Sequence, residues 1–460
     1  MQLQLQKNAD TIRRLIRREA YSHLNKIMQK THPADLAHFY RFFTEHERNK
    51  LFGLLQQDVE KAAEVIVELE STNAARLLET ISPEKITQIL QKMDPDDRVD
   101  IISQLTPEIS DAVMQLLKKV ESEEVEHLIG FEENTAGGIM TTEYLALNEN
   151  LTAKEAIDVL QKSSEVEMFF YLYVVDDRNH LVGVISLRLL IVKPGNTKLK
   201  NIMETEVISV HTGEDQEEVA RQVARYNILA IPVVDDENKI VGVVTVDDTI
   251  DVLRDEATED FLKMAGTSKE EIIEKSVFSS LKVRSPWLLA SLAGGLIAAT
   301  VIDNFKFTLE RIILLSAFLP VIIGMGGNVG IQSTTLMVRG LATGRINIKH
   351  IWHVMVKEIS VGFSLGICYG VLLSLLVLLL TKFGPLGKPP EISLPIIGLI
   401  VGLGIFTSMF IATTVGTFIP ILFAKLKVDP ALASGPFVTT SIDILGVGSY
   451  LMIATILLKV

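Results

Sequence analysis

The C-terminal part of the chain is a series of long apolar stretches separated by short polar segments. A helix that crosses a membrane needs about 20 predominantly apolar residues, and each of these stretches is close to that length or longer. The predicted spans are residues 286–302, 312–337, 354–380, 394–424 and 431–458. Because five is an odd number, the pattern places the two ends of this part on opposite faces of a bilayer.

Residues 1–135 show a helical pattern instead. Apolar positions recur three and four residues apart in segments such as 62–69, 74–81 and 86–93. Prolines stand where such segments begin, and a helix accepts proline in its first turn. These prolines are Pro33, Pro83, Pro95 and Pro107. The pattern predicts an all-α, superhelical stack of short helical hairpins.

The central part contains a tandem repeat. Residues 172–186 match residues 231–245 at an offset of 59, and each copy reads as a β-branched strand, an Asp/Asn turn and a second strand carrying one glycine. An amphipathic helix precedes each hairpin, so the repeat predicts a pair of α/β domains.

These patterns together predict a multidomain chain with four parts. They are a helical acidic N-terminal domain at 1–135, a tandem α/β pair at 136–250, an acidic segment at 251–280 that leads toward the membrane and a five-helix transmembrane domain at 281–460.

Charge separates the membrane part from the rest. Residues 1–276 carry 51 acidic and 31 basic side chains, whereas residues 277–460 carry 6 acidic and 13 basic ones. The beginning of the chain, MQLQLQKNADTIRRLIRRE, lacks the apolar core of a secretory signal, so we expect the acidic half in the cytoplasm. The single cysteine, Cys368, agrees with a reducing compartment. A strongly acidic half without a basic patch argues against nucleic-acid binding.

Acidic side chains gather in two segments of the soluble part. Asp94, Asp96, Asp97 and Asp100 crowd one predicted helix start, and a second group occupies residues 247–260. Each cluster alone is commonly a solvated helix face. If the two clusters meet, however, a hard divalent cation such as Mg²⁺ turns their repulsion into attraction.

Asp443 is a carboxylate without a nearby basic residue inside the last predicted span. A charge at the centre of a membrane helix costs on the order of 2.5 kcal/mol or more, which indicates that a cation or a water-filled path uses it. Pro436, Thr439 and Thr440 precede it at helical spacing, so a proline kink, two hydroxyls and the carboxylate share one face. This face is predicted to line an ion pathway.

The second span contains four glycines in seven residues, Gly324, Gly326, Gly327 and Gly330. They permit either close helix packing or a local loss of helical geometry. Packing is the commoner role of any one glycine, but the adjacent Asn328 and the distant Asp443 favour an ion pathway here. Glu358 and Asp429 lie near predicted cytoplasmic ends, where Lys357 and Lys427 are close enough to pair with them. Both are interpreted as interfacial salt-bridge or capping residues.

The repeat resembles the CBS domain pair, a regulatory module that in many proteins holds adenine nucleotides. Its ribose-binding signature, Ser or Thr followed three residues later by Asp, is present in the second copy as Thr245 and Asp248. In the first copy, Ser186 is followed by Leu189 instead. The resemblance therefore makes an adenine nucleotide such as ATP a candidate ligand of the second copy.

The whole chain resembles the MgtE family of bacterial Mg²⁺ channels or transporters. The motifs that carry the resemblance are PVIIGMGGNVGIQ at 320–332, DPALASGPFVTTSID at 429–443, AGGIMT at 136–141 and VTVDDTIDVLRDEATED at 244–260. The resemblance implies a homodimer in the cytoplasmic membrane, with Asp443 of each subunit holding hydrated Mg²⁺ beside Gly326, Gly327 and Asn328. It also implies that residues 251–280 form a long connecting, or plug, helix.

The resemblance further implies a set of acidic residues that sense internal Mg²⁺ and close the pore. They are Glu64, Asp96, Asp100, Asp215, Glu217, Asp248, Asp251, Glu256, Glu259 and Asp260. Two positions depart from the family pattern: Asn227 stands where relatives can carry an acidic residue, and Ile331 where some relatives are polar.

Two other functions stay open at this point. One is a CBS-regulated transporter of another divalent cation, such as Co²⁺ or Mn²⁺, gated mainly by adenine nucleotide. The other is a cytosolic sensor that uses its spans only as an anchor, although an anchor has no use for Asp443. An enzyme is not expected, because the sequence has no Ser/His/Asp or Cys/His constellation and no G-x-x-x-x-G-K-[ST] loop.

Overall fold

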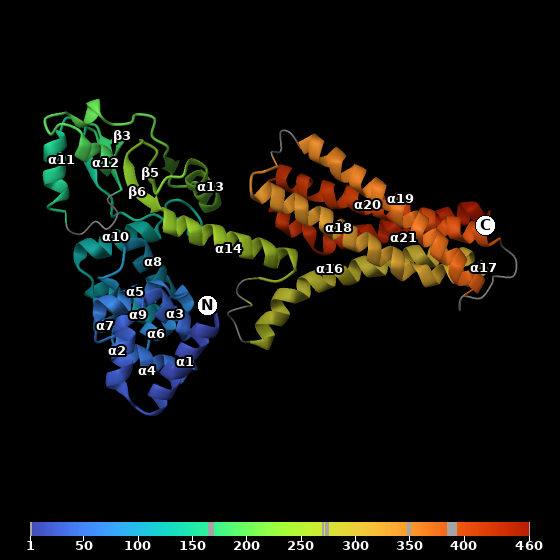
Figure 1. The fold of residues 1–460 in the computed structure, drawn as a ribbon, viewed down its shortest axis with the longest axis horizontal. Helices are drawn as coiled ribbons and strands as arrows, with labels where there is room; N and C mark the ends of the chain where they lie inside the picture. Colours follow the sequence, from blue (N-terminus) through green and yellow to red (C-terminus); the bar gives the residue numbers. More distant parts are fainter. Residues whose placement is uncertain are drawn as a thin grey trace. The chain divides into compact units, whose positions relative to one another are not determined.

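The computed structural model describes residues 2–163, 170–268, 271, 276–346, 351–383 and 393–459. The chain forms two compact units, Met1–Arg254 and Asp255–Val460. Each unit has its own hydrophobic core and is described by itself (Figure 1).

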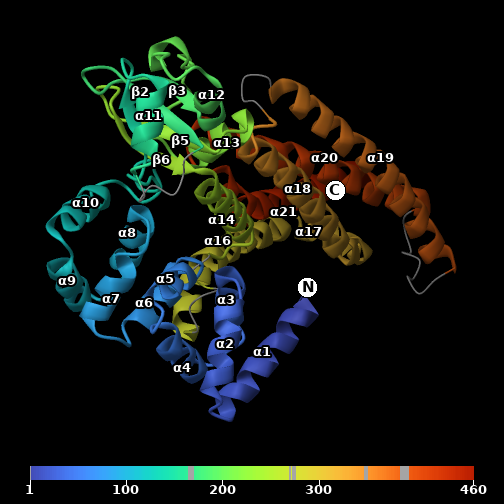
Figure 2. The same cartoon turned by 60° about the vertical axis from the view of Figure 1, so that its left-hand side comes forward.

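Ten helices build the first part of the first unit. They are α1 (Gln2–Arg17), α2 (Tyr21–Lys30), α3 (Pro33–Tyr40), α4 (Glu45–Leu55), α5 (Val59–Val67), α6 (Ser71–Leu78), α7 (Pro83–Leu90), α8 (Pro95–Gln104), α9 (Pro107–Leu116) and α10 (Lys119–Ile129). From α3 onward each helix packs against the helix two places further along the chain, up to α8 on α10, and Figure 2 shows the resulting curved row. The predicted superhelical stack is confirmed, with its four prolines at the first position of α3, α7, α8 and α9.

The repeat forms two small sheets of the same topology. In the first, β1 (Ala146–Asn148) runs parallel to β2 (Tyr171–Val175), which pairs antiparallel with β3 (Leu181–Ser186). In the second, β4 (Val210–His211), β5 (Ala230–Val234) and β6 (Ile240–Thr245) repeat this order. Tyr171 pairs with Ser186 as Ala230 pairs with Thr245, so the predicted duplication extends to the strand register.

Helices accompany both sheets. They are α11 (Ala153–Leu160), α12 (Leu187–Val192), α13 (Gln216–Tyr226) and the longer α14 (Val246–Met264). The predicted connecting helix at 251–280 is thus helical as far as Met264. Residues 269–270 and 272–275 lie outside the described part of the chain.

The second unit contains five helices long and apolar enough to cross a membrane, counted over the described residues. Four of them are α16 (Val277–Asn304), α19 (Ile351–Phe383), α20 (Leu394–Lys425) and α21 (Pro436–Leu458), and the fifth span joins the 3₁₀ segment η2 (Ile313–Phe318) to α18 (Leu319–Ala342). The short α17 (Lys306–Arg311) and the 3₁₀ turn η4 (Pro430–Ser434) connect spans. All five predicted spans are confirmed, and the first begins earlier than expected because the helix continues through Pro286.

The glycine-rich segment of the second span keeps its helical geometry, because α18 is continuous from Leu319 to Ala342. Of the two roles that the sequence left open, close packing is the one observed at Gly326 and Gly330. A Cβ atom at Gly326 would lie 2.5 Å from Ser408 Oγ, and one at Gly330 would lie 2.1 Å from Ile442 Cδ1. By contrast, Gly324 and Gly327 have no such neighbour within 4 Å.

Glycines also join α19 to α20. A Cβ atom at Gly370 would lie 2.7 Å from the carbonyl oxygen of Gly402, and one at Gly362 would lie 2.2 Å from Thr413 Oγ1. As residue numbers increase along α19, the residue numbers of the contacted positions on α20 decrease. The two helices therefore run antiparallel, with their backbones in close approach.

Gly370→Ala is therefore expected to destabilise the membrane unit by about 1–3 kcal/mol, since the added methyl group meets a backbone carbonyl that cannot rotate away. Thermal unfolding of the detergent-purified protein measures this change. The matched control is Gly324→Ala on α18, where the added methyl group meets open space. Equal unfolding temperatures for the two variants would contradict the packing described here.

Candidate ion pathway and acidic cluster

Asp443 lies two turns into α21 and is half-buried. No lysine or arginine of the described residues forms an ion pair with it. Its negative charge is therefore left without a cationic side chain in a span that consists mostly of apolar residues. The structure agrees with the sequence in this respect: Asp443 has no basic partner among the described residues.

The residues before Asp443 are arranged differently from the prediction. Pro436 is buried at the first position of α21, directly after η4, so it starts the helix and does not kink it. Thr440 donates its hydroxyl proton to the carbonyl oxygen of Pro436, and its methyl group lies against Gly294 of α16. Thr439 donates to the carbonyl oxygen of Gly435 at 3.3 Å. Both hydroxyl protons are thus used inside the helix, so each hydroxyl oxygen has only its lone pairs left for another partner.

The exposed face of α18 carries polar side chains. Asn328, Gln332 and Thr335 follow one another at helical spacing and are exposed, and Gly327 adjoins them with open space beside its Cα. Gly326 contacts Ile442, the residue before Asp443, so α18 and α21 are directly packed. An amide and hydroxyl face on a membrane helix needs water or a second protein surface, because lipid cannot satisfy its hydrogen bonds.

A second acidic site lies where α14 ends. Lys263 Nζ is 2.8 Å from Asp429 Oδ2 and also contacts Glu259. Asp429 additionally accepts a hydrogen bond from the backbone nitrogen of Ala431 at 2.8 Å, which caps η4. The prediction that Asp429 is a salt-bridge or capping residue is therefore confirmed, with Lys263 and not Lys427 as its basic partner. Asp260 lies nearby, and burial, followed by the charge of Asp429, raises its pKa to about 6.

A third acidic site joins the starts of two helices in the first unit. Asp96 and Asp97 occupy the first turn of α8, and Asp248 occupies the first turn of α14. Burial, followed by the charges of Asp248 and Asp97, raises the pKa of Asp96 well above its ordinary value. Burial and the charges of Asp248 and Asp94 raise the pKa of Asp97 to about 8. The two clusters that the sequence showed separately do meet.

Two details of this cluster bear on cation binding. Asp96 Oδ1 is buried without a hydrogen-bond partner among the described residues, although a buried carboxylate oxygen nearly always has one. The hydroxyl of Thr245 contacts Asp248, whose pKa is raised to about 6, mainly by burial. A cation beside Asp96 would supply the missing partner.

Asp100 borders this cluster: its charge is among those that raise the pKa of Asp97, and burial, followed by the charge of Glu133, raises its own pKa to about 6. The other predicted sensing residues do not join it. Glu64 is exposed, Asp215 caps α13 through the backbone nitrogen of Glu217 at 2.9 Å, and Glu217 pairs with Arg221 at 2.6 Å. Asp251 is exposed and Glu256 is half-buried. Within the described residues, no three His, Cys, Asp or Glu side chains converge on a point that could hold a metal directly.

Sequence reasoning missed one residue in these sites, Lys263, which neutralises Asp429. Asp97 and Asp247 were placed in the two acidic segments but not among the sensing residues, and both belong to the acidic cluster. The proline at the first position of α8 is a signal for Asp97, because it fixes the next two aspartates in the first helical turn. Nothing in the sequence marks Lys263, which is 166 residues from its partner.

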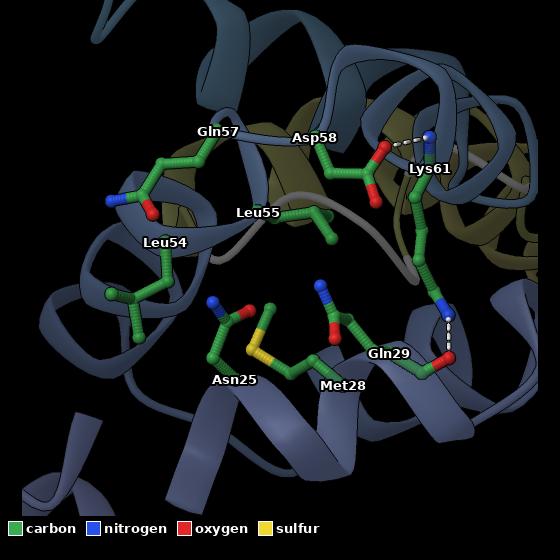
Figure 3. Close-up of a pocket in the computed structure, with 8 residues that line it drawn as sticks. All are labelled: Asn25, Met28, Gln29, Leu54, Leu55, Gln57, Asp58 and Lys61. Atoms are coloured by element: carbon green, nitrogen blue, oxygen red, sulfur yellow. Dashed lines mark hydrogen bonds between the residues drawn. The ribbon is translucent and has the colours of Figure 1, made fainter. Parts of the chain in front are cut away.

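Two hollows lie elsewhere in the first unit. A pocket of about 220 Å³ lies between α2, α4 and α5 and is lined mainly by amides and apolar groups. Lys61 Nζ donates a hydrogen bond of 2.8 Å across one side of it to the carbonyl oxygen of Gln29 (Figure 3). The pocket holds one carboxylate, Asp58, so it does not extend the acidic cluster.

A larger cleft of about 560 Å³ lies beside the first repeat. Its lining includes two aromatic rings, Phe170 and Tyr171, together with Ser186 and Arg188. An aromatic ring can stack on a base and the guanidinium can hold a phosphate. The second copy offers less to a polyphosphate, because Thr245 and Asp248 belong to the strongly negative cluster.

Three family models match parts of the chain. A family model described as "Divalent cation transporter" matches residues 319–453, one described as "MgtE intracellular N domain" matches 31–134, and the CBS domain matches 136–193 and 199–255.

Relatives of known name match most of the chain. The magnesium transporter MgtE of Enterococcus faecalis is 37% identical, with 92% of this chain and 89% of the relative covered. That of Bacillus subtilis is 34% identical, covering 93% and 92%, and that of Thermus thermophilus is 38% identical, covering 73% of each chain. The solved cytosolic domain of the Mg²⁺ channel MgtE in complex with ATP is 36% identical, covers 53% of this chain and 99% of that domain, and has a TM-score of 0.51.

The raised carboxyl pKa values of the α8 and α14 cluster predict how the stability of residues 1–268 depends on pH. The native state binds more protons than the unfolded state between the ordinary carboxyl pKa near 4 and the raised value of Asp97. In the presence of a chelator, the free energy of unfolding is therefore expected to fall as pH rises from about 6 to 8.

Thermal unfolding at a series of pH values measures this dependence. Asp97→Asn should flatten the pH profile, because it removes the group with the pKa of about 8. The exposed Asp111 is not among the charges that raise the cluster pKa values, so Asp111→Asn is the matched control and should leave the slope unchanged. Stability that rises with pH would contradict the burial of these carboxyl groups.

Proposed function

Because the chain belongs to the MgtE family of transporters, we propose that it is a Mg²⁺-selective channel or transporter of the cytoplasmic membrane whose ion pathway is centred on Asp443. The observation that carries this proposal is the half-buried carboxylate of a membrane span that has no cationic partner among the described residues. Three relatives that match most of the chain are named magnesium transporters.

Selection of Mg²⁺ follows from how this ion holds its water. Mg²⁺ dehydrates reluctantly, so a few fixed oxygens can select its hydrated form by charge and size. In our proposal Asp443 supplies the charge, while the hydroxyl oxygens of Thr439 and Thr440 and the side chain of Asn328 contact the water shell. Gly326 and Gly327 have no side chains, so the backbone of α18 can lie close to the pathway. Pro436 fixes where α21 begins.

The pathway needs a second copy of the chain. One unit leaves Asn328, Gln332 and Thr335 exposed on α18, and lipid is a poor environment for them. A homodimer that places this face and Asp443 around a shared axis would enclose a polar path. We propose this arrangement, with 281–460 as the pore domain, 251–280 as the plug helix, and 1–135 and 136–250 as the sensing domains.

Internal Mg²⁺ would close this pore through the acidic cluster. Asp96, Asp97 and Asp248 repel one another when ionised, and the unpaired Oδ1 of Asp96 fits a cation ligand. A Mg²⁺ ion that keeps most of its water needs only one or two carboxylates, so no close cluster of three ligands is required. Binding would favour the compact head, and the head would bias the pore shut by differential affinity for the two states.

The remaining predicted sensing residues are assigned weaker roles in this proposal. They would hold further hydrated ions once the head and plug helix are in the closed state, and they are Glu64, Asp100, Asp215, Glu217, Asp251, Glu256, Glu259 and Asp260.

An adenine nucleotide such as ATP is proposed as a second regulator, held in the cleft beside Ser186 and Arg188. The aromatic rings and the guanidinium of the cleft support this place, as does the ATP complex of the related cytosolic domain. Thr245 and Asp248 form the alternative nucleotide site. A transporter of Co²⁺ or Mn²⁺ gated mainly by nucleotide is the competing function.

Asp443→Asn is expected to reduce Mg²⁺ uptake to the level of empty vesicles, because the variant keeps the shape of the side chain and removes its charge. Fluorescent Mg²⁺ indicator trapped in proteoliposomes measures the flux. Asp303→Asn, at the exposed end of α16, is the matched control and should transport normally. Full flux through Asp443→Asn would remove the pore assignment, and faster uptake of Co²⁺ or Mn²⁺ by the wild type would favour the competing function.

The double variant Asp96→Asn, Asp248→Asn is expected to keep conducting at internal Mg²⁺ concentrations that close the wild type. Removing both charges abolishes the cation's preference for the compact head. Patch recordings with stepped Mg²⁺ on the cytoplasmic side test this, with the exposed pair Asp35→Asn, Asp111→Asn as control. A closing threshold equal to that of the wild type would exclude the α8 and α14 cluster as the sensor.

A further inference from the structure

Glu358 is a buried carboxylate that the proposed ion pathway does not use. It lies about 10 Å along α19 from Ile351 and is only 7% exposed. The interfacial role expected from the sequence is wrong, because Lys357 is exposed and no ion pair joins it to Glu358 in the described part of the chain. Neighbouring protein therefore sets the environment of this carboxylate.

Hydroxyl groups of two other helices surround this position. Ser333 of α18, 4% exposed, donates to Glu358 Oε2 at 3.5 Å, which is long for a hydroxyl hydrogen bond. On α20, Thr413 lies against Gly362, one turn after Glu358. Since α19 and α20 run antiparallel, the next turn outward places Glu358 opposite Thr417. Both threonines are fully buried.

The threonine hydroxyls cannot neutralise the carboxylate. Thr413 donates its proton to the carbonyl oxygen of Met409 at 2.8 Å, and Thr417 donates to that of Thr413 at 2.7 Å. The hydroxyl oxygens therefore present lone pairs, which a carboxylate repels. A buried charge without a counter-ion costs several kcal/mol, so this carboxylate must be neutralised by a bound proton or by a cation.

We propose that Glu358, Ser333 and Thr417 form a second cation site inside the membrane unit, which takes a small monovalent ion such as Na⁺. One positive charge neutralises the one carboxylate, whereas Mg²⁺ would leave an excess charge and would have to give up most of its water. An ion with oxygen ligands at about 2.4 Å, as for the similarly sized Ca²⁺, holds two ligands at right angles about 3.4 Å apart. Ser333 Oγ and Glu358 Oε2, 3.5 Å apart, are close to this separation.

The site is separate from the Asp443 pathway. Glu358 lies on α19, which packs against α20, while α21 packs against α16, α18 and α20. The close approach of α19 and α20 at Gly362 favours Na⁺ over the larger K⁺. Na⁺ bound here would fasten α18, α19 and α20 together and so would stabilise the membrane unit.

The test is thermal unfolding of the full-length purified protein in a chelator, with NaCl, KCl or choline chloride at equal ionic strength. Na⁺ is expected to raise the unfolding temperature of the wild type saturably by several degrees, and K⁺ and choline by much less. Glu358→Gln should abolish the shift, and Ser333→Ala should require a roughly tenfold higher Na⁺ concentration for it, as for the loss of one ligand worth about 1.4 kcal/mol.

Two controls separate this site from other effects. Glu310→Gln removes an exposed carboxylate at the end of α17 and should keep the Na⁺ shift. Asp443→Asn should also keep the Na⁺-dependent rise in unfolding temperature, although its Mg²⁺ flux is lost. The test of the Na⁺ site is therefore independent of the test of the pore. If Glu358→Gln does not fold, ²²Na⁺ binding to Ser333→Ala and Thr417→Val decides the question.

Several results would overturn the proposal. They are the same unfolding temperature in Na⁺ and choline, a Na⁺ shift that persists in Glu358→Gln, and unchanged ²²Na⁺ affinity in both hydroxyl variants. A wild-type unfolding temperature that depends on pH but not on Na⁺ would assign the carboxyl group to a bound proton instead.

Discussion

Negative charge in places where water cannot screen it is the constraint on which this protein depends. An ionised carboxylate that leaves water must be protonated, paired or joined by a cation, because the penalty otherwise reaches several kcal/mol. Asp443 lies in a membrane span without a basic neighbour among the described residues, and Asp96 and Asp97 crowd Asp248 at the starts of two helices. In the proposed function, hydrated Mg²⁺ neutralises the carboxylates of both sites. It is the transported ion at Asp443 and the regulatory ion at the acidic cluster.

Asp429 meets the constraint in another way, because Lys263 supplies a covalently attached cation. The three acidic sites therefore differ in how easily their positive partner can leave. A permeating ion exchanges rapidly, a regulatory ion exchanges with the cytoplasmic pool, and a lysine leaves only when its helix moves. In the proposed function, this ordering would give the membrane unit and the head distinct responses to the internal cation concentration.

Local patterns allowed most of the fold to be predicted, whereas long-range partners could not be. Hydropathy located the five spans, the 59-residue repeat located both hairpins, and the prolines of α3, α7, α8 and α9 marked helix starts. The pairs expected at Lys357 and Lys427 were wrong because adjacency in sequence says little about which side of a helix a residue occupies. The burial of Glu358 did have a signal: Gly362, Gly366 and Gly370 continue its helix face at intervals of four, which places it on the packed side.

The ion pair between Lys263 and Asp429 would affect how the protein responds to internal Mg²⁺ in the proposed function. A chelator or a depleted cytosol can strip magnesium from carboxylates, but neither can strip an ammonium group that belongs to the polypeptide. In the proposed function, part of the attachment between the end of α14 and η4 would therefore survive starvation, and release would require displacement of that helix end in addition to ion loss. This remaining ion pair would make the opening of the pore depend more steeply on internal Mg²⁺, because it would break only after the bound Mg²⁺ ions have left.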